Sequence, residues 1–147
     1  MSELKIEKMR ENAVVPTYGT DDAAGMDLYA AISEKIVLNP NETKLIPTGI
    51  KMAIPKGYGG FIYARSGLAT KKGLAPANKV GVVDADYRGE VMVALYNHST
   101  EIQEIDVKER IAQMVIAPYL KVDFKVVDKI DEDTVRGSKG FGSTGTK

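Results

Sequence analysis

Short runs of alternating apolar and polar residues cover most of the 147-residue chain, and turn-forming residues separate them. Residues 48–54 are apolar at every second position from Ile50 to Ile54, as expected for a strand with one buried face. Residues 90–97 are apolar at both parities, which is typical of a central strand covered on both faces. Three further runs predict short strands: residues 61–64, 110–118 and 121–127.

One segment departs from this two-residue period. Residues 65–73 offer Ser66 as a helix N-cap, two lysines in the last turn and Gly73 as a stop. Many short strands with closely spaced turns and one short helix predict an all-β sandwich or barrel. We expect the packed body to span residues 1–128, because residues 129–147 are first acidic and then rich in glycine.

Composition narrows the possible functions. Hydrophobic residues make up 44% of the chain, so the body is expected to fold as one domain around a core. Lys plus Arg and Asp plus Glu each number 20, which argues against a nucleic-acid-binding surface. The chain has no cysteine, and we find no signal-peptide pattern and no run that could span a membrane. These features predict a cytoplasmic protein without membrane contacts.

The glycine-rich segment RGSKGFGSTGTK (residues 136–147) contains a G-x-G-x-x-G spacing from Gly140 to Gly145. A dinucleotide site would need a strand before this spacing and a helix after it, and the pattern favours neither. What remains is a stretch of amide and hydroxyl donors with Arg136, Lys139 and one aromatic ring, Phe141. Such a segment suits a flap that closes over phosphates. Composition alone favours the alternative of a plain disordered chain end.

Residues 84–89 (DADYRG) lie between two strand-like runs, which predicts a hairpin whose connection carries two carboxylates, a Tyr and an Arg. Asp and Gly are common in turns for backbone reasons alone, so an ordinary turn is an equal alternative. An ionised Asp84 at this connection could hold a water molecule as a general base.

Other polar residues stand in positions that need an explanation. Asp27 and Gln113 lie within apolar runs, where each needs hydrogen-bond partners if buried. Arg65 and Ser66, at the start of the predicted helix, could bind an anion, although this segment taken by itself favours an ordinary capped surface helix. His98 is expected at the surface. With one His and no Cys, a zinc or copper site is not expected.

Five segments resemble, in order, the five motifs of the trimeric deoxyuridine triphosphate nucleotidohydrolases (dUTPases): AAGMDLYA, ARSGLA, GVVDADYRGE, RIAQMVI and RGSKGFGSTG. Their order and spacing match from about Gly25 to Gly145. The resemblance implies a distorted jelly roll that hydrolyses dUTP to dUMP and pyrophosphate with Mg²⁺, limiting uracil in DNA and supplying dUMP for thymidylate synthesis. It also implies a homotrimer in which each active site uses all three subunits, with residues 129–147 closing over a neighbour's site.

The resemblance further implies a role for each matching residue. Asp84 would deprotonate the water that attacks the α-phosphorus, Tyr87 would pack against the deoxyribose, and Asn78 with the backbone after it would read uracil. Asp27 would contact Mg²⁺ only through a metal-bound water. The remaining substrate-binding candidates would hold the phosphates, line the nucleoside pocket or close the flap: Arg65, Ser66, Gly67, Gly81, Val83, Met92, Gln113, Arg136, Phe141, Gly142, Ser143 and Thr144.

Three departures from the family pattern are visible: Ala64 before Arg65, Lys108 with Glu109 before Arg110, and Lys139 in the tail. None of them changes Asp84. Two other functions stay open. One is a dCTP deaminase-related enzyme of the same fold, and the other is a regulatory protein whose binding to a partner is gated by nucleotide.

Overall fold

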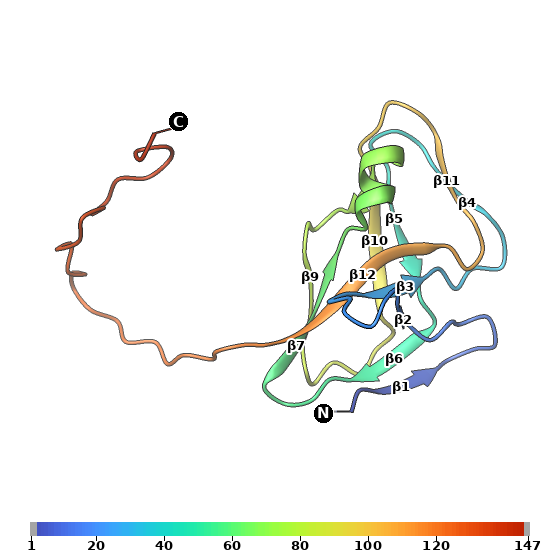
Figure 1. Cartoon of the computed structure of the whole chain (residues 1–147), viewed down its shortest axis with the longest axis horizontal. Coiled ribbons are helices and arrows are strands. Elements are labelled where there is room, and N and C mark those ends of the chain that lie inside the picture. The colour runs from blue at the N-terminus through green and yellow to red at the C-terminus, as the bar shows by residue number, and fades with distance from the viewer. Residues whose placement is uncertain (1–2, 146–147) are drawn as a thin grey trace.

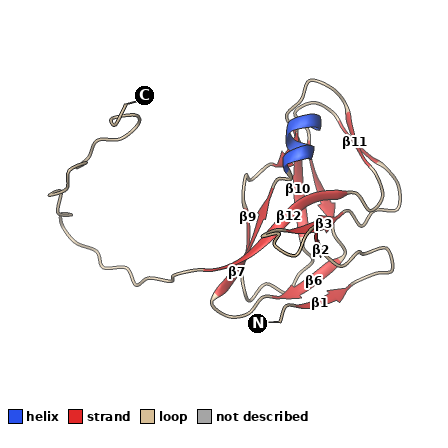
Figure 2. Ribbon diagram, in the orientation of Figure 1, coloured by secondary structure: helices blue, strands red, loops and turns tan. Residues whose placement is uncertain are grey.

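The computed structural model describes residues 3–145, a β-rich body from which the last part of the chain extends away (Figure 1). Within this range the only helical element is one short turn, η1 (Leu68–Lys72), at one end of the body (Figure 2). None of the described helical residues is in a segment long and apolar enough to cross a membrane. The strands are β1 (Lys5–Lys8), β2 (Thr17–Tyr18), β3 (Met26–Tyr29), β4 (Ile36–Leu38), β5 (Thr43–Pro47), β6 (Ile50–Ala53), β7 (Tyr58–Tyr63), β8 (Leu74–Pro76), β9 (Gly81–Val83), β10 (Met92–Asn97), β11 (Gln103–Ile105) and β12 (Arg110–Pro118).

The strands pair in antiparallel fashion and form two larger and two smaller sheets. The largest sheet has the order β2-β3-β12-β7-β9, and the second has the order β5-β10-β8. The pairs β1-β6 and β4-β11 complete the body. The all-β prediction is therefore confirmed.

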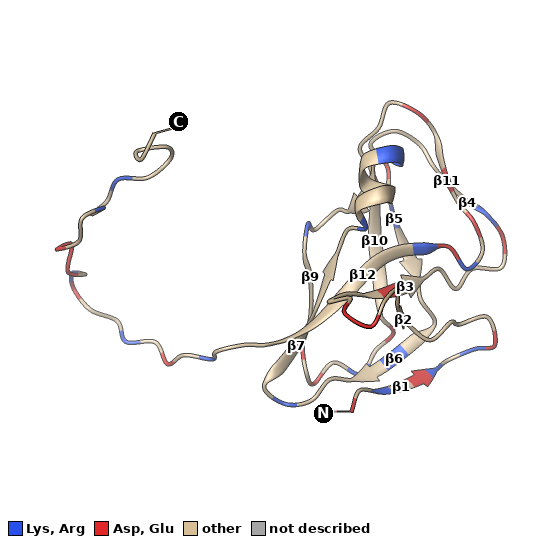
Figure 3. Cartoon of the chain, in the orientation of Figure 1, with Lys and Arg blue, Asp and Glu red and all other residues tan. Residues whose placement is uncertain are grey.

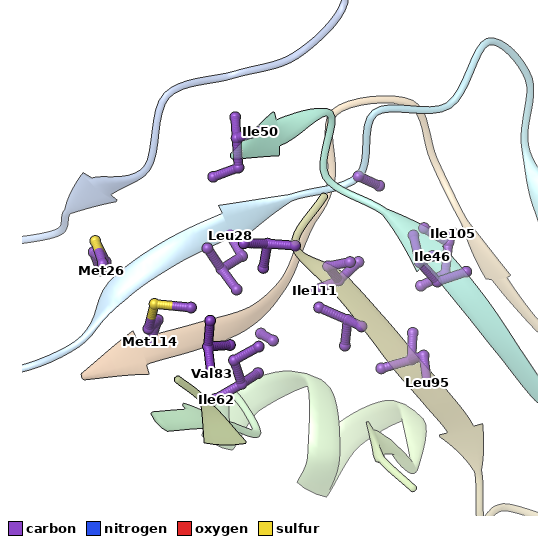
Figure 4. Close-up of a cluster of buried hydrophobic side chains, with 14 of the residues drawn as sticks. Met26, Leu28, Ile46, Ile50, Ile62, Val83, Leu95, Ile105, Ile111 and Met114 are labelled. Atoms are coloured by element: carbon purple, nitrogen blue, oxygen red, sulfur yellow. The ribbon is translucent and has the colours of Figure 1, made fainter. Parts of the chain in front are cut away.

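The core lies between the largest sheet and the sheet of β5, β10 and β8 (Figure 4). Leu28 of β3 and Met114 of β12 contribute to it from the largest sheet, Ile46 and Leu95 from the second sheet, and all four are fully buried. Burying one such side chain contributes roughly 1.5–3 kcal/mol. This core fixes β3 and β12, which carry Asp27 and Gln113, and β9, which Asp84 follows.

Two strand predictions can be compared with this core. Ile50, Met52 and Ile54 are all buried, so the one-faced strand predicted at residues 48–54 is confirmed at β6. Strand β10 is central, between β5 and β8, as expected from its composition. Only the face of β10 that carries Val93 and Leu95 is fully buried, because its other face is only half covered within a single chain.

The predicted helix is shorter than expected, and Ser66 is not its cap. Gly67, the residue before η1, already has helical backbone angles and no side-chain cap, and Gly73 ends η1 in the left-handed conformation with φ 69°. The backbone carbonyl of Ser66 already accepts a hydrogen bond from the Thr70 hydroxyl at 2.7 Å. Ser66 therefore lies inside the first turn, and its own hydroxyl is left available to a neighbouring hollow.

The hairpin predicted around residues 84–89 is wrong. Strand β9 pairs with β7, whereas β10 pairs with β5 and β8, so the connection crosses from one sheet to the other. The chain is turned away at Val91, whose N–H donates to Ile50 O at 2.9 Å and whose carbonyl accepts from the Thr48 hydroxyl. These bonds direct β10 toward β5 and leave β9 beside β7.

The strand predicted at residues 121–127 does not form. From Leu120 to Val126 the apolar side chains alternate with charged ones, but Phe124 is 93% exposed, because no neighbouring strand of the same chain is within reach. Packing within one chain therefore ends near Pro118, where β12 stops, well before residue 128. His98 is exposed, as expected.

Candidate functional site

Most of the candidate residues outside the tail gather around two separate hollows. We call the first, of about 220 Å³, the Arg65 hollow; it is lined by Gly19, Ala23, Gly25, Asp27, Arg65, Ser66, Gly67 and Gln113. We call the second, of about 240 Å³, the Asp84 hollow; it is lined by Ile62, Asn78, Gly81, Val82, Val83, Asp84, Tyr87, Glu90, Val91 and Met92. They share no lining residue, so neither holds all the candidate groups.

In the Arg65 hollow the one carboxylate is paired with guanidinium groups. Asp27, on β3, is nearly buried and accepts from Arg65 Nε at 2.9 Å and from Arg110 Nη1 at 3.5 Å. The expectation that this carboxylate needs partners is confirmed. Two guanidinium groups face one carboxylate, whereas acidic and basic residues are interspersed over the rest of the chain (Figure 3). The hollow is therefore suited to a small anion with several negative oxygens.

The pairing of β3 with β12 explains how Gln113 reaches this hollow. Gln113 lies opposite Asp27 in the ladder, and its amide Nε2 donates to Ala64 O at 2.9 Å. A Cβ at Gly25 would lie 2.4 Å from Gln113 Oε1, so the glycine leaves the space that the carboxamide occupies. The half-buried carboxamide is thus held at the edge of the hollow.

The Asp84 hollow combines an apolar wall with polar groups at its rim. Val83 is buried, Met92 is half-buried, and Asp84 is exposed where β9 ends. Asn78 follows β8 and lies close to Gly81, where an added Cβ would be 3.4 Å from the Asn78 amide nitrogen. A flat apolar wall beside an amide and a carboxylate suits a planar, polar-edged ligand such as a nucleobase with its sugar.

The Tyr87 ring is folded back onto its own loop. Its hydroxyl donates to Glu90 O at 2.8 Å, and its ring is 46% exposed. A Cβ at Gly89 would lie 2.4 Å from the Tyr87 hydroxyl oxygen, so only glycine allows this arrangement. The ring therefore forms one wall of the hollow.

The candidates in the tail lie away from both hollows. The segment that follows β12 leaves the body, and every described residue from Tyr119 onward is exposed (Figure 1). This part of the chain carries Arg136, Phe141, Gly142, Ser143 and Thr144. A single chain thus presents the candidate residues as three spatially separate groups.

One ion pair beside the Asp84 hollow could not be predicted from the sequence. Arg10 Nη2 donates to Glu90 Oε1 at 2.5 Å, although the two residues are 80 positions apart. Neither residue stands out in its local pattern, because charged residues are common in loops. Only the folded chain brings them together.

Comparison with known proteins identifies the family. A family model described as dUTPase matches residues 11–145. The chain belongs to the dUTPase family. The deoxyuridine 5'-triphosphate nucleotidohydrolase of Hahella chejuensis is 49% identical, over 90% of this chain and 88% of the relative. That of Nautilia profundicola is 48% identical, over 97% and 98% respectively.

Solved dUTPase structures share the fold. The dUTPase of Staphylococcus bacteriophage 80alpha, as a single-residue mutant with dUpNHpp, superposes with a TM-score of 0.90 at 28% identity, covering 99% of both chains. A mutant dUTPase from phage phi11 of S. aureus, whose structure describes the coordination of a structural Mg(II) ion, superposes with a TM-score of 0.80 at 26% identity, covering 88% of this chain and 99% of that one. The predicted resemblance and the fold are confirmed.

Proposed function

We propose that this dUTPase hydrolyses dUTP to dUMP and pyrophosphate in active sites that are each completed by three copies of the chain. The observation that supports this proposal is the separation of the candidate residues into the Arg65 hollow, the Asp84 hollow and the exposed tail. The Arg65 hollow suits phosphates, the Asp84 hollow suits a nucleoside, and the tail carries further hydrogen-bond donors. Together they supply what a nucleoside triphosphate requires, and a homotrimer can bring them together.

The unpaired segment after β12 also supports assembly. Leu120, Val122, Phe124 and Val126 form an alternating apolar face that a single chain leaves in solvent. Such a face is costly in water and is stabilised when a partner covers it. A neighbouring copy that covers this face would direct the residues after it, 129–147, toward another subunit's site. Residues 129–147 would then act as an arm on the body formed by residues 1–128.

In the proposed reaction, Asp84 accepts a proton from a water molecule as that water attacks the α-phosphorus. The new bond joins the water oxygen to phosphorus, and the bond to the bridging oxygen of pyrophosphate breaks. The Arg65 guanidinium and the Ser66 hydroxyl would hold the phosphate oxygens, and Gln113 would hold the water network. Their fixed positions would orient the chain of phosphates for attack from the side of Asp84.

The Asp84 hollow would select uracil and deoxyribose. Uracil offers N3–H as a donor and O4 as an acceptor, whereas cytosine presents the opposite pair. The Asn78 amide and the backbone from Gly81 to Val83 could pair with the uracil edge, and cytosine would leave these groups unpaired. Met92 would contribute to the apolar wall, and the Tyr87 ring would leave no room for a 2′-hydroxyl.

The residues present fit a Mg²⁺ ion held through the substrate. Among residues 3–145, no three His, Cys, Asp or Glu side chains gather to hold a metal directly. Mg²⁺ commonly keeps several waters and binds through substrate phosphates, so one nearby carboxylate is enough. Asp27 lies in the Arg65 hollow, and each of its oxygens can accept from a metal-bound water besides its guanidinium partner. When bound, the ion would neutralise charge on the phosphates.

The arm would close the site. Arg136 would meet the γ-phosphate together with the hydroxyls of Ser143 and Thr144, and Phe141 would stack over uracil. Gly142 in the arm has φ 87°, a conformation that glycine adopts without strain. The Arg65 hollow is open beside Gly67, where an added Cβ would meet nothing within 4 Å. Closure would exclude bulk water from the reacting phosphate. A cytoplasmic location is part of this proposal.

Pyrophosphate release from dUTP, UTP, dTTP and dCTP, measured separately with Mg²⁺, tests the function. We expect release from dUTP alone. Ammonia release from dCTP would instead favour the deaminase-related alternative. No release from any nucleotide, combined with nucleotide-dependent capture of a second protein, would favour the regulatory alternative.

Mixing two inactive variants tests whether the active site is shared. Asp84→Asn removes the proposed base, and Arg65→Ala removes a phosphate ligand from the other hollow. In trimers co-assembled from equal amounts of both, about one quarter of the sites would combine an intact Asp84 with an intact Arg65 from a neighbour. We therefore expect about one quarter of wild-type pyrophosphate release from the mixture.

Each variant alone, assembled by the same procedure, is the control and should be inactive. If both hollows of an active site came from one chain, every site would carry one defect. The mixture would then be as inactive as either variant, which would contradict the shared site.

A further inference from the structure

The loop after β9 is braced internally, so that its functional residues are held as one unit. The Tyr87 N–H donates to Asp84 O at 3.1 Å, and the Tyr87 hydroxyl donates to Glu90 O at 2.8 Å. The Arg88 guanidinium donates to Ala85 O at 2.8 Å and to Tyr87 O at 3.0 Å. A shift of the loop at Glu90 would therefore carry Tyr87 and Asp84 with it.

Glu90 itself is fixed by two segments that are distant in sequence. Its Oε1 accepts from Arg10 Nη2 at 2.5 Å and from the Gly49 N–H at 3.0 Å, and its side chain is only 17% exposed. The adjacent Val91 N–H donates to Ile50 O at 2.9 Å, and the Met9 N–H donates to Gly49 O at 2.8 Å. The N-terminal segment, the β5–β6 turn and the end of the loop are thus joined at one carboxylate.

We propose that Arg10 and Glu90 are positioning residues that set the selectivity for deoxyribose through Tyr87. Both act through the loop: the carboxylate fixes the Glu90 backbone, whose carbonyl in turn holds the Tyr87 hydroxyl. Gly49 serves the same arrangement, since its φ of 68° belongs to the conformation that favours glycine. The proposal rests on the proposed function, because it gives Tyr87 the role of excluding a 2′-hydroxyl.

The ratio of kcat/KM for dUTP to kcat/KM for UTP is the measurement that tests this role. In Glu90→Ala the Gly49 amide and the Arg10 guanidinium lose their acceptor, the loop loosens, and the ring no longer excludes the ribose. We expect the ratio to fall about tenfold. Partial loss of folding would lower both rates by the same factor and leave the ratio unchanged.

Arg10→Ala and Arg10→Lys separate the ion pair from the Gly49 contact. Arg10→Ala retains the Glu90–Gly49 hydrogen bond and is expected to lower the ratio by about threefold. Arg10→Lys keeps a cation and should restore most of the ratio. Because Arg10 is 37% exposed, its removal is the milder change and decides the question if Glu90→Ala does not fold.

Glu104→Ala is a matched control, since it breaks the Lys35–Glu104 ion pair at 2.9 Å, between the segment before β4 and β11. It should leave the dUTP to UTP ratio unchanged. An unchanged ratio in folded Glu90→Ala and Arg10→Ala would overturn the proposal. If the wild-type protein hydrolysed no dUTP, the proposed function would fail instead, and amide hydrogen exchange at residues 85–89 would still test the positioning: protection equal to wild type in Arg10→Ala would overturn it.

Discussion

Replacing Asp84 by Asn is expected to lower kcat for dUTP by about 10²- to 10⁴-fold. The amide has nearly the shape of the carboxylate but cannot take the proton of the attacking water. Asp84 is exposed at the end of β9 and forms no ion pair with any residue from 3 to 145, so the fold does not depend on its charge. Pyrophosphate release measures kcat, and calorimetric titration with the nonhydrolysable analogue dUpNHpp measures the affinity, which we expect to stay within about threefold.

Asp86→Asn is the matched control for this result. Asp86 is an exposed carboxylate of the same loop. It shares with Asp84, Lys56 and Lys121 the lining of a neighbouring hollow, but unlike Asp84 it does not line the Asp84 hollow. Its replacement should leave kcat within about threefold, because no proton transfer is assigned to it. Near-wild-type turnover in Asp84→Asn, or an equal loss in both variants, would remove Asp84 from the role of general base.

The features that could be predicted from the sequence are those encoded by neighbouring residues. The alternation that ends at Ile54 identifies a buried strand face without knowledge of its partner, and Gly73 marks the end of a helix through its own backbone conformation. The candidate groups of the site are also local, since each motif places its chemistry within a few residues. These properties depend on short-range geometry, which the chain specifies directly.

The features that could not be predicted depend on pairing between distant segments. The pairing of β9 with β7 and the contact of Arg10 with Glu90 join residues whose local patterns give no indication of each other. Ser66 fits the composition of an N-cap, but the turn begins one residue too early for its hydroxyl to cap it. Residues 121–127 have the alternation of a strand and lack a partner within their own chain, so their pattern describes a surface that another chain would cover.

Deleting residues 136–147 is expected to lower kcat for dUTP by at least about 10²- to 10³-fold while leaving the fold and the assembly intact. The deletion removes the Arg136 guanidinium and the hydroxyls of Ser143 and Thr144, which would meet the γ-phosphate. Every described residue of this segment is exposed and contributes nothing to the core of its own chain. Pyrophosphate release measures the activity, and light scattering together with thermal unfolding measures the mass and the stability.

Phe141→Ala separates stacking from closure within the same arm. Its ring is fully exposed in the free chain, so the substitution should not change stability. Losing one base–aromatic stack raises KM for dUTP by about tenfold, whereas kcat depends on the phosphate donors that this variant retains.

Full activity of the chain that lacks residues 136–147 would show that the arm is a plain chain end. A deleted chain that loses both its oligomeric mass and its activity would instead place the arm in the subunit contacts, because closure over phosphates alone cannot hold the copies together.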